Sequence, residues 1–335
     1  MNPIAIYSGN TIIYYSAVLI CLGAAAWFSL SCGLYTARGG RTAAMWALLP
    51  LAAALSVLLS RLIHWYCHAE QYAGLWAALT DYSIGGYCLP GLLLGVVLAV
   101  FIVKQLRLTE DMAGLFDALA PGAALGLALI RLSALFNSSC RGTVIVKDPR
   151  FQHLPIASAV STSSGGMEYR FATFFVHFLL LLGIAALLLV FYLRQDERPH
   201  GRKGDTALLF LLLYSATELV LDSTRYDSSF LRFNGFVSLV QIVSALSIAG
   251  VLAVYSVRSV KELGLRPRHW LLWSGYLLSL IGTGVLEYLV QRYGSWYKLC
   301  YSFMSLTCLL MVLVCWGMYL TLKGEKRAYS QRRRN

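Results

Sequence analysis

Stretches of about twenty consecutive apolar residues recur along the whole chain, and this feature limits the fold more than any other. As an α-helix that rises about 1.5 Å per residue, such a stretch crosses a bilayer core that is about 30 Å thick. Of the 335 residues, 58% are hydrophobic and only 13% are charged, whereas about a quarter are charged in a soluble domain. A β-barrel would instead need short strands of alternating polarity. We therefore predict an all-α polytopic bundle of transmembrane helices.

Nine such spans are predicted from the hydropathy pattern. They cover residues 11–33, 43–66, 83–103, 113–136, 171–193, 206–225, 235–256, 269–290 and 299–322. The first basic residue is Arg38, so the first span lacks the basic start of a removable signal peptide. We expect this span to remain in the protein as a membrane helix.

Basic residues divide unevenly between the two sides of this arrangement. The loops of one side and the C-terminal tail hold Arg38, Arg41, Lys104, Arg107, Arg194, Arg198, Arg202, Lys203, Arg258, Lys261, Arg266, Arg268, Lys323, Lys326, Arg327, Arg332, Arg333 and Arg334. By the positive-inside rule this side faces the cytoplasm, so the N-terminus faces out and the C-terminus in. The net charge of +12 then follows from membrane topology, and no nucleic-acid partner is expected.

A charged linker at residues 257–268 separates the last two spans from the others. We predict a seven-helix core over residues 1–260 and a two-helix appendage with a basic cytoplasmic tail over residues 261–335. The one long connection, at about 137–170, is turn-rich, and loops of this kind are usually functional or disordered. We expect it on the outer side.

The eight Cys residues form no CxxC pair and show no spacing typical of a zinc site. Cys67 and Cys140 fall at the outer ends of spans, where a disulfide is possible. We expect no metal site and no cofactor.

Ionisable residues inside the spans are the candidates for chemistry, because each costs roughly 2.5–3.5 kcal/mol at the centre of a bilayer. In the second span, Arg61 and His64 are three residues apart and share one helical face. Extension of the Arg61 side chain to the membrane interface is an equally good interpretation. In the fourth span, Asp117 and Pro121 predict a helix start. Arg131 lies about 21 Å further along that helix, in the outer leaflet.

Two more spans carry unusual residues. In the sixth, Glu218, Asp222 and Arg225 lie on one stripe of a helix. Asp222 can form a structural ion pair with Arg225, whereas the deeper Glu218 needs another partner, for which Arg131 is the candidate. Near the end of the eighth span, Glu287 is expected to belong to a solvated helix end.

These candidates gather in the outward half of the membrane. They are Arg61, Arg131, Asn137, Arg225 and a glycine-rich break in the third span at residues 85–91, which begins with Gly85 and Gly86. Irregular backbone at membrane depth is found only against protein or a water-filled cavity. Several guanidinium groups would meet an anion that enters from the outer leaflet, and their planar fork matches phosphate. We infer a site for a phospholipid head group.

The stretch DALAPGAALGLALIRLSALFNSSCRG, residues 117–142, resembles the signature helix of the prolipoprotein diacylglyceryl transferases. In that family the helix carries an Asp, an Ala-Pro pair, an Arg, an Asn six residues later and a Gly five further on. The matching residues are Asp117, Pro121, Arg131, Asn137 and Gly142.

Two further segments are similar to the same family. Residues 81–100 resemble its aromatic-Gly-Gly segment, and YSATELVLDSTRYD with FVSLVQIVSA resembles its Tyr, acid-x-x-Arg and Gln-x-x-Ser elements. The residues that match the latter are Tyr214, Asp222, Arg225, Gln241 and Ser244. Order and spacing agree over roughly residues 10–258.

The resemblance implies transfer of the diacylglyceryl group from phosphatidylglycerol to the thiol of a lipobox cysteine, on the outer face of a bacterial plasma membrane. It implies phosphatidylglycerol, prolipoprotein signal peptides and membrane lipids as partners. The candidate catalytic residues are Arg131, His64 and Asp222. The candidate substrate-binding residues are Arg131, Asn137, Arg225, Arg61, Gly85, Gly86, Glu218 and Tyr214.

Three positions differ from the family pattern. Ile130 stands where the family has a Gly, Pro90 where it has a His and Glu218 where it has an Arg. His64, or else His177, is therefore the candidate base, and a structural role for His64 stays open. The alternative functions are a phospholipid- or lipoprotein-binding membrane protein without activity and a small-solute transporter.

Overall fold

The structure, a computed structural model, describes residues 4–8, 11–81, 86–137, 140–161, 166–195, 202–231, 234–294 and 296–332. Gly85, Arg198, Arg333 and Arg334, which the sequence analysis names, lie outside the described residues.

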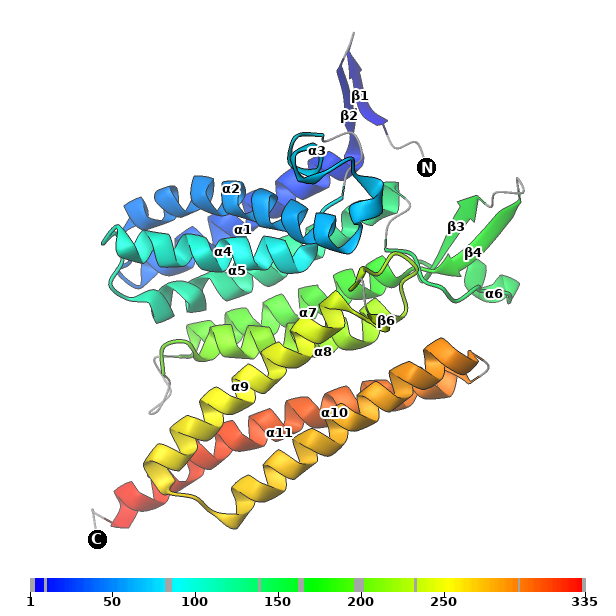
Figure 1. Ribbon diagram of the computed structural model, residues 1–335. Coiled ribbons are helices and arrows are strands. Elements are labelled where there is room, and N and C mark those ends of the chain that lie inside the picture. The colour runs from blue at the N-terminus through cyan, green and yellow to red at the C-terminus, as the bar shows by residue number, and fades with distance from the viewer. Residues whose placement is uncertain are drawn as a thin grey trace. The chain divides into compact units, whose positions relative to one another are not determined.

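Long helices make up most of the described chain (Figure 1). They are α1 (Tyr15–Ala37), α2 (Thr42–Cys67), α4 (Leu89–Gln105), α5 (Met112–Leu132), α7 (Thr173–Leu193), α8 (Asp205–Ser223), α9 (Leu239–Leu263), α10 (Pro267–Tyr293) and α11 (Tyr297–Arg332). Among the described residues, eight helices are long and apolar enough to cross a membrane, and α4 is a shorter apolar helix of 17 residues. The predicted all-α polytopic bundle is confirmed, whereas the orientation of its termini stays a prediction.

Short elements connect the long helices. They are β1 (Ile4–Ser8), β2 (Thr11–Tyr14), η1 (Ala69–Gln71), α3 (Leu75–Thr80), η2 (Ser133–Phe136), α6 (Pro149–Gln152), β3 (Ala157–Ser161), β4 (Met167–Phe171), β5 (Phe230–Leu231) and β6 (Asn234–Ser238). Strand β1 pairs with β2, and β3 pairs with β4, both antiparallel. The hairpin of β3 and β4 lies in the long connection that the sequence predicts between α5 and α7.

The chain divides into two compact units. The first comprises Met1–Phe210 with Thr224–Phe233, and the second comprises Leu211–Ser223 with Asn234–Asn335. Helix α8 therefore begins in the first unit and continues into the second. The predicted division at residue 260 stays a prediction.

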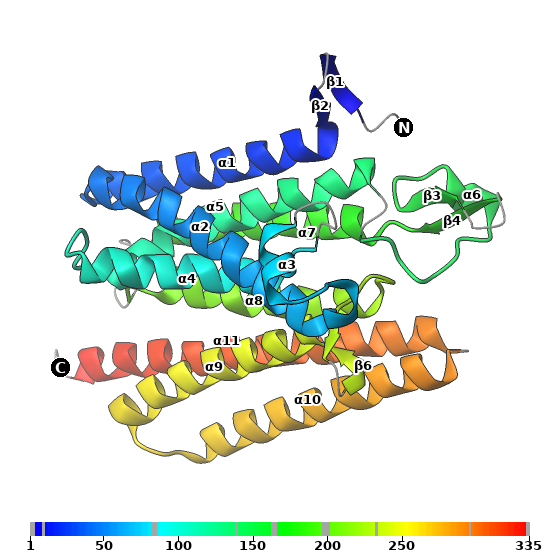
Figure 2. The ribbon, with the colours of Figure 1, turned by 45° about the horizontal axis from the view of Figure 1, so that its top comes forward.

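Within the first unit, α1 and α7 pack against α5, and α2 packs against α4 (Figure 2). Glycines allow the helices to approach closely at two places, as is common in membrane bundles. A Cβ atom on Gly95 would lie 2.4 Å from the backbone nitrogen of Ser56 in α2. A Cβ atom on Gly126 would lie 2.8 Å from the backbone oxygen of Gly23 in α1.

Helix α4 begins later than the predicted third span. It starts at Leu89, with Pro90 in its first turn, where the missing N–H would have no helical partner in any case. The backbone nitrogen of Cys88 donates to Ser60 Oγ at 2.7 Å, and Ser60 Oγ donates to the carbonyl of Cys88 at 2.8 Å. This exchange ties the start of α4 to α2.

Helix α5 begins earlier than the sequence analysis predicts. Its N-cap is Asp111, whose carboxylate accepts a hydrogen bond from the backbone nitrogen of Gly114 at 2.9 Å. Asp117 lies inside the helix and is fully buried. The prediction of a helix start at Asp117 is wrong, because this carboxylate accepts its hydrogen bonds from a distant segment and not from its own first turn.

In the second unit, α10 packs against α11, and α11 packs against α9. One stripe of α10 is buried and polar: Thr283 hydrogen-bonds Thr307 at 2.8 Å, and His269 hydrogen-bonds Ser259 at 2.9 Å. Glu287 belongs to the same stripe, is 3% exposed and accepts a hydrogen bond from Gln291. The expectation of a solvated helix end at Glu287 is therefore wrong.

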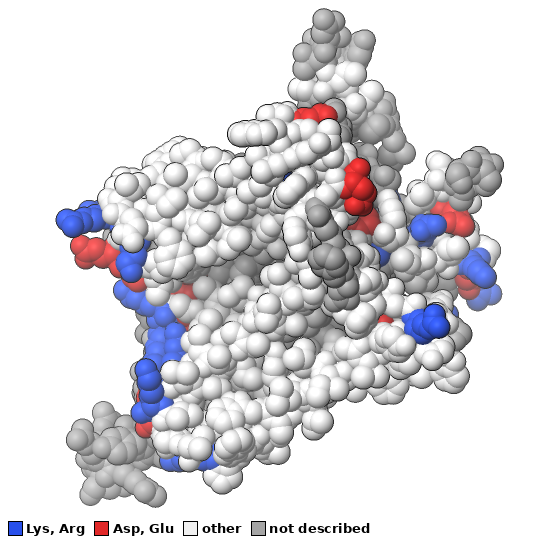
Figure 3. Space-filling view, in the orientation of Figure 1, with Lys and Arg blue, Asp and Glu red and all other residues white. Residues whose placement is uncertain are grey.

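Charged residues lie mainly at the ends of the helices on the face drawn in Figure 3. Exposed side chains along the helices, such as Leu187 of α7 and Leu278 of α10, are apolar. This distribution is typical of helices that face lipid.

Candidate functional site

Arg131 lies one residue before the end of α5 and is 8% exposed. Its Nη1 donates to the sulfur of Cys140 at 3.3 Å. After α5 the chain continues as the short helix η2, and Asn137 follows in an extended conformation. The chain reverses here, which brings Cys140 against the Arg131 side chain.

Asp227 connects Arg225 to Cys140, the residue that contacts Arg131. Nε of Arg225 donates to Oδ1 of Asp227 at 3.0 Å, and the backbone nitrogen of Cys140 donates to Oδ2 at 2.9 Å. The backbone nitrogen of Thr143 also donates to the carbonyl of Thr224 at 2.8 Å. The structure thus joins the segments that carry Arg131 and Arg225, and we call Arg131, Cys140, Arg141, Arg225 and Asp227 the arginine cluster.

The electrostatics of Asp227 follow from these contacts. Burial acts to raise the pKa of Asp227, but the charge and hydrogen bond of Arg225 and the N–H of Cys140 outweigh it. The pKa of Asp227 therefore lies below its ordinary value of 3.8, and the carboxylate is charged at neutral pH.

Arg141, which the sequence analysis does not name, is also buried in this place, with 6% exposure. Its guanidinium donates to Ser158 Oγ and, at 2.8 Å, to the carbonyl of Asn137. Its Cζ lies 4.8 Å from the centre of the Phe174 ring. The one signal for Arg141 in the sequence is its position between Asn137 and Gly142, two residues that match the family signature.

His64 lies in the last turn of α2, in a separate group of rings. Its Nδ1 is 2.9 Å from the hydroxyl oxygen of Tyr72, and its ring stacks on His68 with centroids 4.3 Å apart. Gly86 has a φ of +83°, and a Cβ atom there would lie 2.3 Å from the Tyr72 hydroxyl and 2.7 Å from the His64 ring. Glycine is required at this position by both conformation and space.

Arg61 is 2% exposed, so the interpretation that its side chain extends to the membrane interface is wrong. Its Nε donates to the carbonyl of Ala78 and its Nη2 to the carbonyl of Asp81, both at 2.5 Å. These carbonyls end the short helix α3, where a cation also complements the partial negative charge of the helix end. Arg61 therefore supports α3.

Tyr214, Glu218 and Asp222 lie in the part of α8 that belongs to the second unit. Tyr214 donates to Glu218, and Ser238 Oγ donates to Oδ2 of Asp222 at 2.5 Å. The side chain of Gln241 donates to the carbonyl of Leu219 at 3.2 Å within the same unit. The predicted pairs of Glu218 with Arg131 and of Asp222 with Arg225 stay predictions.

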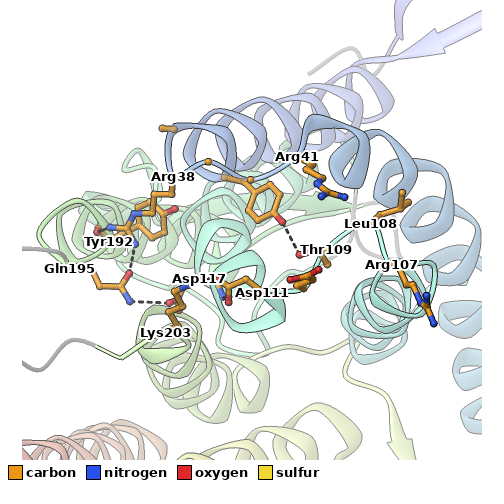
Figure 4. Close-up of a pocket in the computed structure, with 16 residues that line it drawn as sticks. Arg38, Arg41, Arg107, Leu108, Thr109, Asp111, Asp117, Tyr192, Gln195 and Lys203 are labelled. Carbon is orange, nitrogen blue, oxygen red and sulfur yellow. Dashed lines mark hydrogen bonds and ion pairs between the residues drawn. The ribbon is translucent and has the colours of Figure 1, made fainter.

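A second group of polar residues lines a cavity of about 770 Å³ at the opposite end of α5 (Figure 4). Asp117 accepts hydrogen bonds from the backbone nitrogens of Gly204 at 2.7 Å and Ala207 at 2.9 Å and from Gln195 at 3.1 Å. Gln195 in turn accepts from Arg38 at 2.5 Å. Asp117 thus anchors the start of α8 to α5.

Lys203 completes this end of the first unit. Its Nζ lies 2.5 Å from Oδ2 of Asp111, the N-cap of α5. The hydrogen bond and charge of Asp111 raise the pKa of Lys203 above its ordinary value. Residues 117 and 131 are about 21 Å apart along a helix, so the cavity is separate from the arginine cluster.

The described cysteines form no disulfide bond, so the disulfide considered between Cys67 and Cys140 is absent. Among the described residues, no group of His, Cys, Asp and Glu could hold a metal ion.

Fold and site together define a multi-pass α-helical membrane protein with a guanidinium cluster at one end of a buried helix. The family model described as "Prolipoprotein diacylglyceryl transferase" matches residues 3–257. The chain belongs to this family, which makes it a transferase of lipoprotein biosynthesis.

Three relatives illustrate the similarity, and each is named phosphatidylglycerol–prolipoprotein diacylglyceryl transferase. The one from Clostridium botulinum (strain Loch Maree / Type A3) is 25% identical over 260 residues, which is 78% of this chain and 97% of the relative. The one from Shouchella clausii is 24% identical over 272 residues, 81% of this chain and 94% of the relative. The one from Acaryochloris marina is 30% identical over 189 residues, 54% and 60% of the two chains.

Asp227→Asn should lower the thermal stability of the detergent-solubilised protein at neutral pH, because Arg225 loses its partly buried partner, at a cost of about 1–3 kcal/mol. The pKa of Asp227 is lower in the folded protein than its ordinary value of 3.8. Above pH 3.8 the charged carboxylate therefore adds to the free energy of unfolding, and this contribution is lost as the pH falls through the pKa of the folded protein. The difference in melting temperature between wild type and variant should therefore narrow below pH 3.8.

Glu168→Gln is the matched control. Oε2 of Glu168 and Nη2 of Arg170 form a salt bridge of 3.1 Å, and the two side chains are 32% and 29% exposed. Surface pairs contribute about 0–1 kcal/mol, so this variant should melt close to wild type. Equal melting temperatures for Asp227→Asn and wild type at neutral pH would contradict the role of Asp227.

Proposed function

We propose that this protein transfers the diacylglyceryl group of phosphatidylglycerol to the thiol of a lipobox cysteine in prolipoproteins. The observation that supports this most directly is the arginine cluster, in which Cys140 and Asp227 connect Arg131 with Arg225. Both arginines fall on the family signature. Phosphatidylglycerol and prolipoprotein, which appear in the names of the relatives, are the substrates that we propose for this chain.

The cluster suits the leaving group of such a transfer. A carbon–sulfur bond forms at the terminal glyceryl carbon while the bond from that carbon to the phosphate oxygen breaks, and glycerol phosphate leaves as an anion. The thiol proton passes to a base, because the thiolate is the nucleophile. Three guanidinium groups and one carboxylate leave the cluster with net positive charge, which favours the developing phosphate charge in a water-poor site.

His64 is the residue that we propose as base, because Pro90 occupies the position of the family's His. If Nδ1 donates its proton to the Tyr72 oxygen, Nε2 is left to accept the thiol proton. Asp222 is retained as a second candidate catalytic residue, held by Ser238. We propose that Asn137 and Gly86 of the first unit contact the substrate, and we retain Tyr214 and Glu218 of the second unit as candidate substrate-binding residues.

A phospholipid- or lipoprotein-binding protein without activity is the second candidate function. The observation that favours it is Glu218, an acid where the family has an Arg, which is fully buried and accepts a hydrogen bond from Tyr214. Formation of the thioether product by the purified protein separates the two functions.

We place the arginine cluster on the outer face of a bacterial plasma membrane, with the N-terminus outside and the C-terminus in the cytoplasm. An alkaline phosphatase fused after Arg150 in α6 should then be active, because this enzyme folds only outside the cytoplasm. The same enzyme fused after Arg107 should be inactive. The reverse pattern would contradict the orientation.

Arg131→Ala should abolish transfer, because the phosphate loses one of the guanidinium groups that stabilise its developing charge. Arg131→Lys should restore activity only in part, since an ammonium group keeps the charge but loses the bidentate fork. The measurement is the mass of the thioether formed by purified protein from phosphatidylglycerol and a lipobox peptide. Arg170→Gln is the control and should retain activity. No product from a well-folded wild type would favour the binding protein.

His64→Ala should slow transfer about 10²–10⁴-fold if His64 supplies general-base catalysis. The rate of the variant should recover as the pH approaches the ordinary thiol pKa of about 8.5, because the substrate then ionises without help. His68→Ala is the matched control from the same ring stack. A His64→Ala variant that is slowed equally at all pH values would assign His64 a structural role.

A further inference from the structure

Arg141 is a buried cation without an ion pair among the described residues. Its side chain is 6% exposed, and both of its hydrogen-bond acceptors, Ser158 Oγ and the carbonyl of Asn137, are neutral. Its Nε has no hydrogen-bond partner in the part of the chain that the structure describes. Charged side chains are rarely buried unless they are paired, so this guanidinium calls for a counter-charge.

The position of Arg141 indicates where that counter-charge would bind. Arg141 directly follows Cys140, whose sulfur contacts Arg131. Its carbonyl accepts a hydrogen bond from the backbone nitrogen of Tyr226, the residue after Arg225. The residue thus lies in the strand-like segment that connects the two arginines of the family signature, and it also holds the carbonyl of Asn137.

We propose that Arg141 binds the phosphate group of the substrate together with Arg131 and Arg225. A guanidinium has five N–H donors, and its planar fork can donate two parallel hydrogen bonds to phosphate. The choice of phosphatidylglycerol as ligand rests on the proposed function, whereas the recognition of a phosphate does not.

A purely structural role for Arg141 is the competing explanation. Arg141 connects the loop to β3 through Ser158 and stacks on Phe174, and a neutral donor of similar length would do the same. Burial is the main reason why the pKa of Arg141 is lowered, so the charge is retained at a cost here. An arriving anion would offset that cost, whereas the structural role makes no use of the charge.

The experiment measures binding of short-chain phosphatidylglycerol and of inorganic phosphate to the full-length protein in detergent, by titration calorimetry. Arg141→Gln should weaken binding of phosphatidylglycerol about 10- to 100-fold, the range expected for loss of a charge-assisted hydrogen bond. Arg141→Lys should bind with intermediate affinity. In the transfer assay, Arg141→Gln should raise KM more than it lowers kcat.

Two control variants separate the charge from the structural contacts. Arg150→Gln removes an exposed cation from α6 in the same connection, and Ser158→Ala removes a neutral partner of Arg141. Both should bind phosphatidylglycerol within about twofold of wild type. If Arg141→Gln does not fold, Arg141→Lys is the test variant, and its affinity should still be at least threefold lower.

Unchanged affinity in the folded Arg141 variant would overturn the proposal, as would an equal loss of affinity in Ser158→Ala. Weakened binding of inorganic phosphate would assign the recognition to the phosphate alone, and weakened binding of the lipid only would assign it to the whole head group. A wild type that binds lipid through Arg141 but forms no thioether would refute the proposed function and not this inference. A wild type that forms thioether with an Arg141→Gln variant of unchanged KM would refute only this inference.

Discussion

At the end of the first unit that holds the arginine cluster, the carboxylate of Asp227 connects two segments that are far apart in the chain. It accepts from Nε of Arg225 and from the backbone nitrogen of Cys140, which lies 87 residues earlier in the chain. The chain reversal after α5 is thereby fixed relative to the segment that follows α8. Backbone hydrogen bonds from Thr143 to Thr224 and from Tyr226 to Arg141 join the same two segments. The hydropathy pattern of the helices does not predict these contacts, which connect the segments that carry Arg131 and Arg225.

A second carboxylate performs the corresponding task at the other end of α5. Asp117 accepts from the backbone nitrogens of Gly204 and Ala207, which precede and begin α8. The unsatisfied N–H groups at a helix start are costly to bury, and a buried carboxylate satisfies two of them at once. Helix α5 is thus held at both ends, and 61% of the residues in the most apolar stretch of this span are buried. Because the helix is held in this way, the guanidinium of Arg131 near its end has a fixed position.

The sequence predicted the helices well and their polar connections poorly, for a physical reason. Hydropathy is a local property, so the long apolar runs predicted the helix class and most of the bounds directly. Asp117 was misinterpreted as a helix start because its partners come from residues about ninety positions away. Glu287 was misinterpreted for a similar reason, since its burial depends on how α10 packs. Asp227 and Arg141 were missed because loop residues follow no period that would single them out.

Burial by itself does not distinguish a supporting arginine from one that can bind a ligand. Arg61 is 2% exposed, yet its guanidinium donates to the carbonyls of Ala78 and Asp81 at the end of α3. Arg141 is 6% exposed, but its Nε has no acceptor among the described residues. The distinction lies in where the donors go, because a guanidinium whose donors are used cannot also bind phosphate without breaking those bonds. Two arginines with the same burial therefore have different consequences for the site, and only the partners of their N–H groups tell them apart.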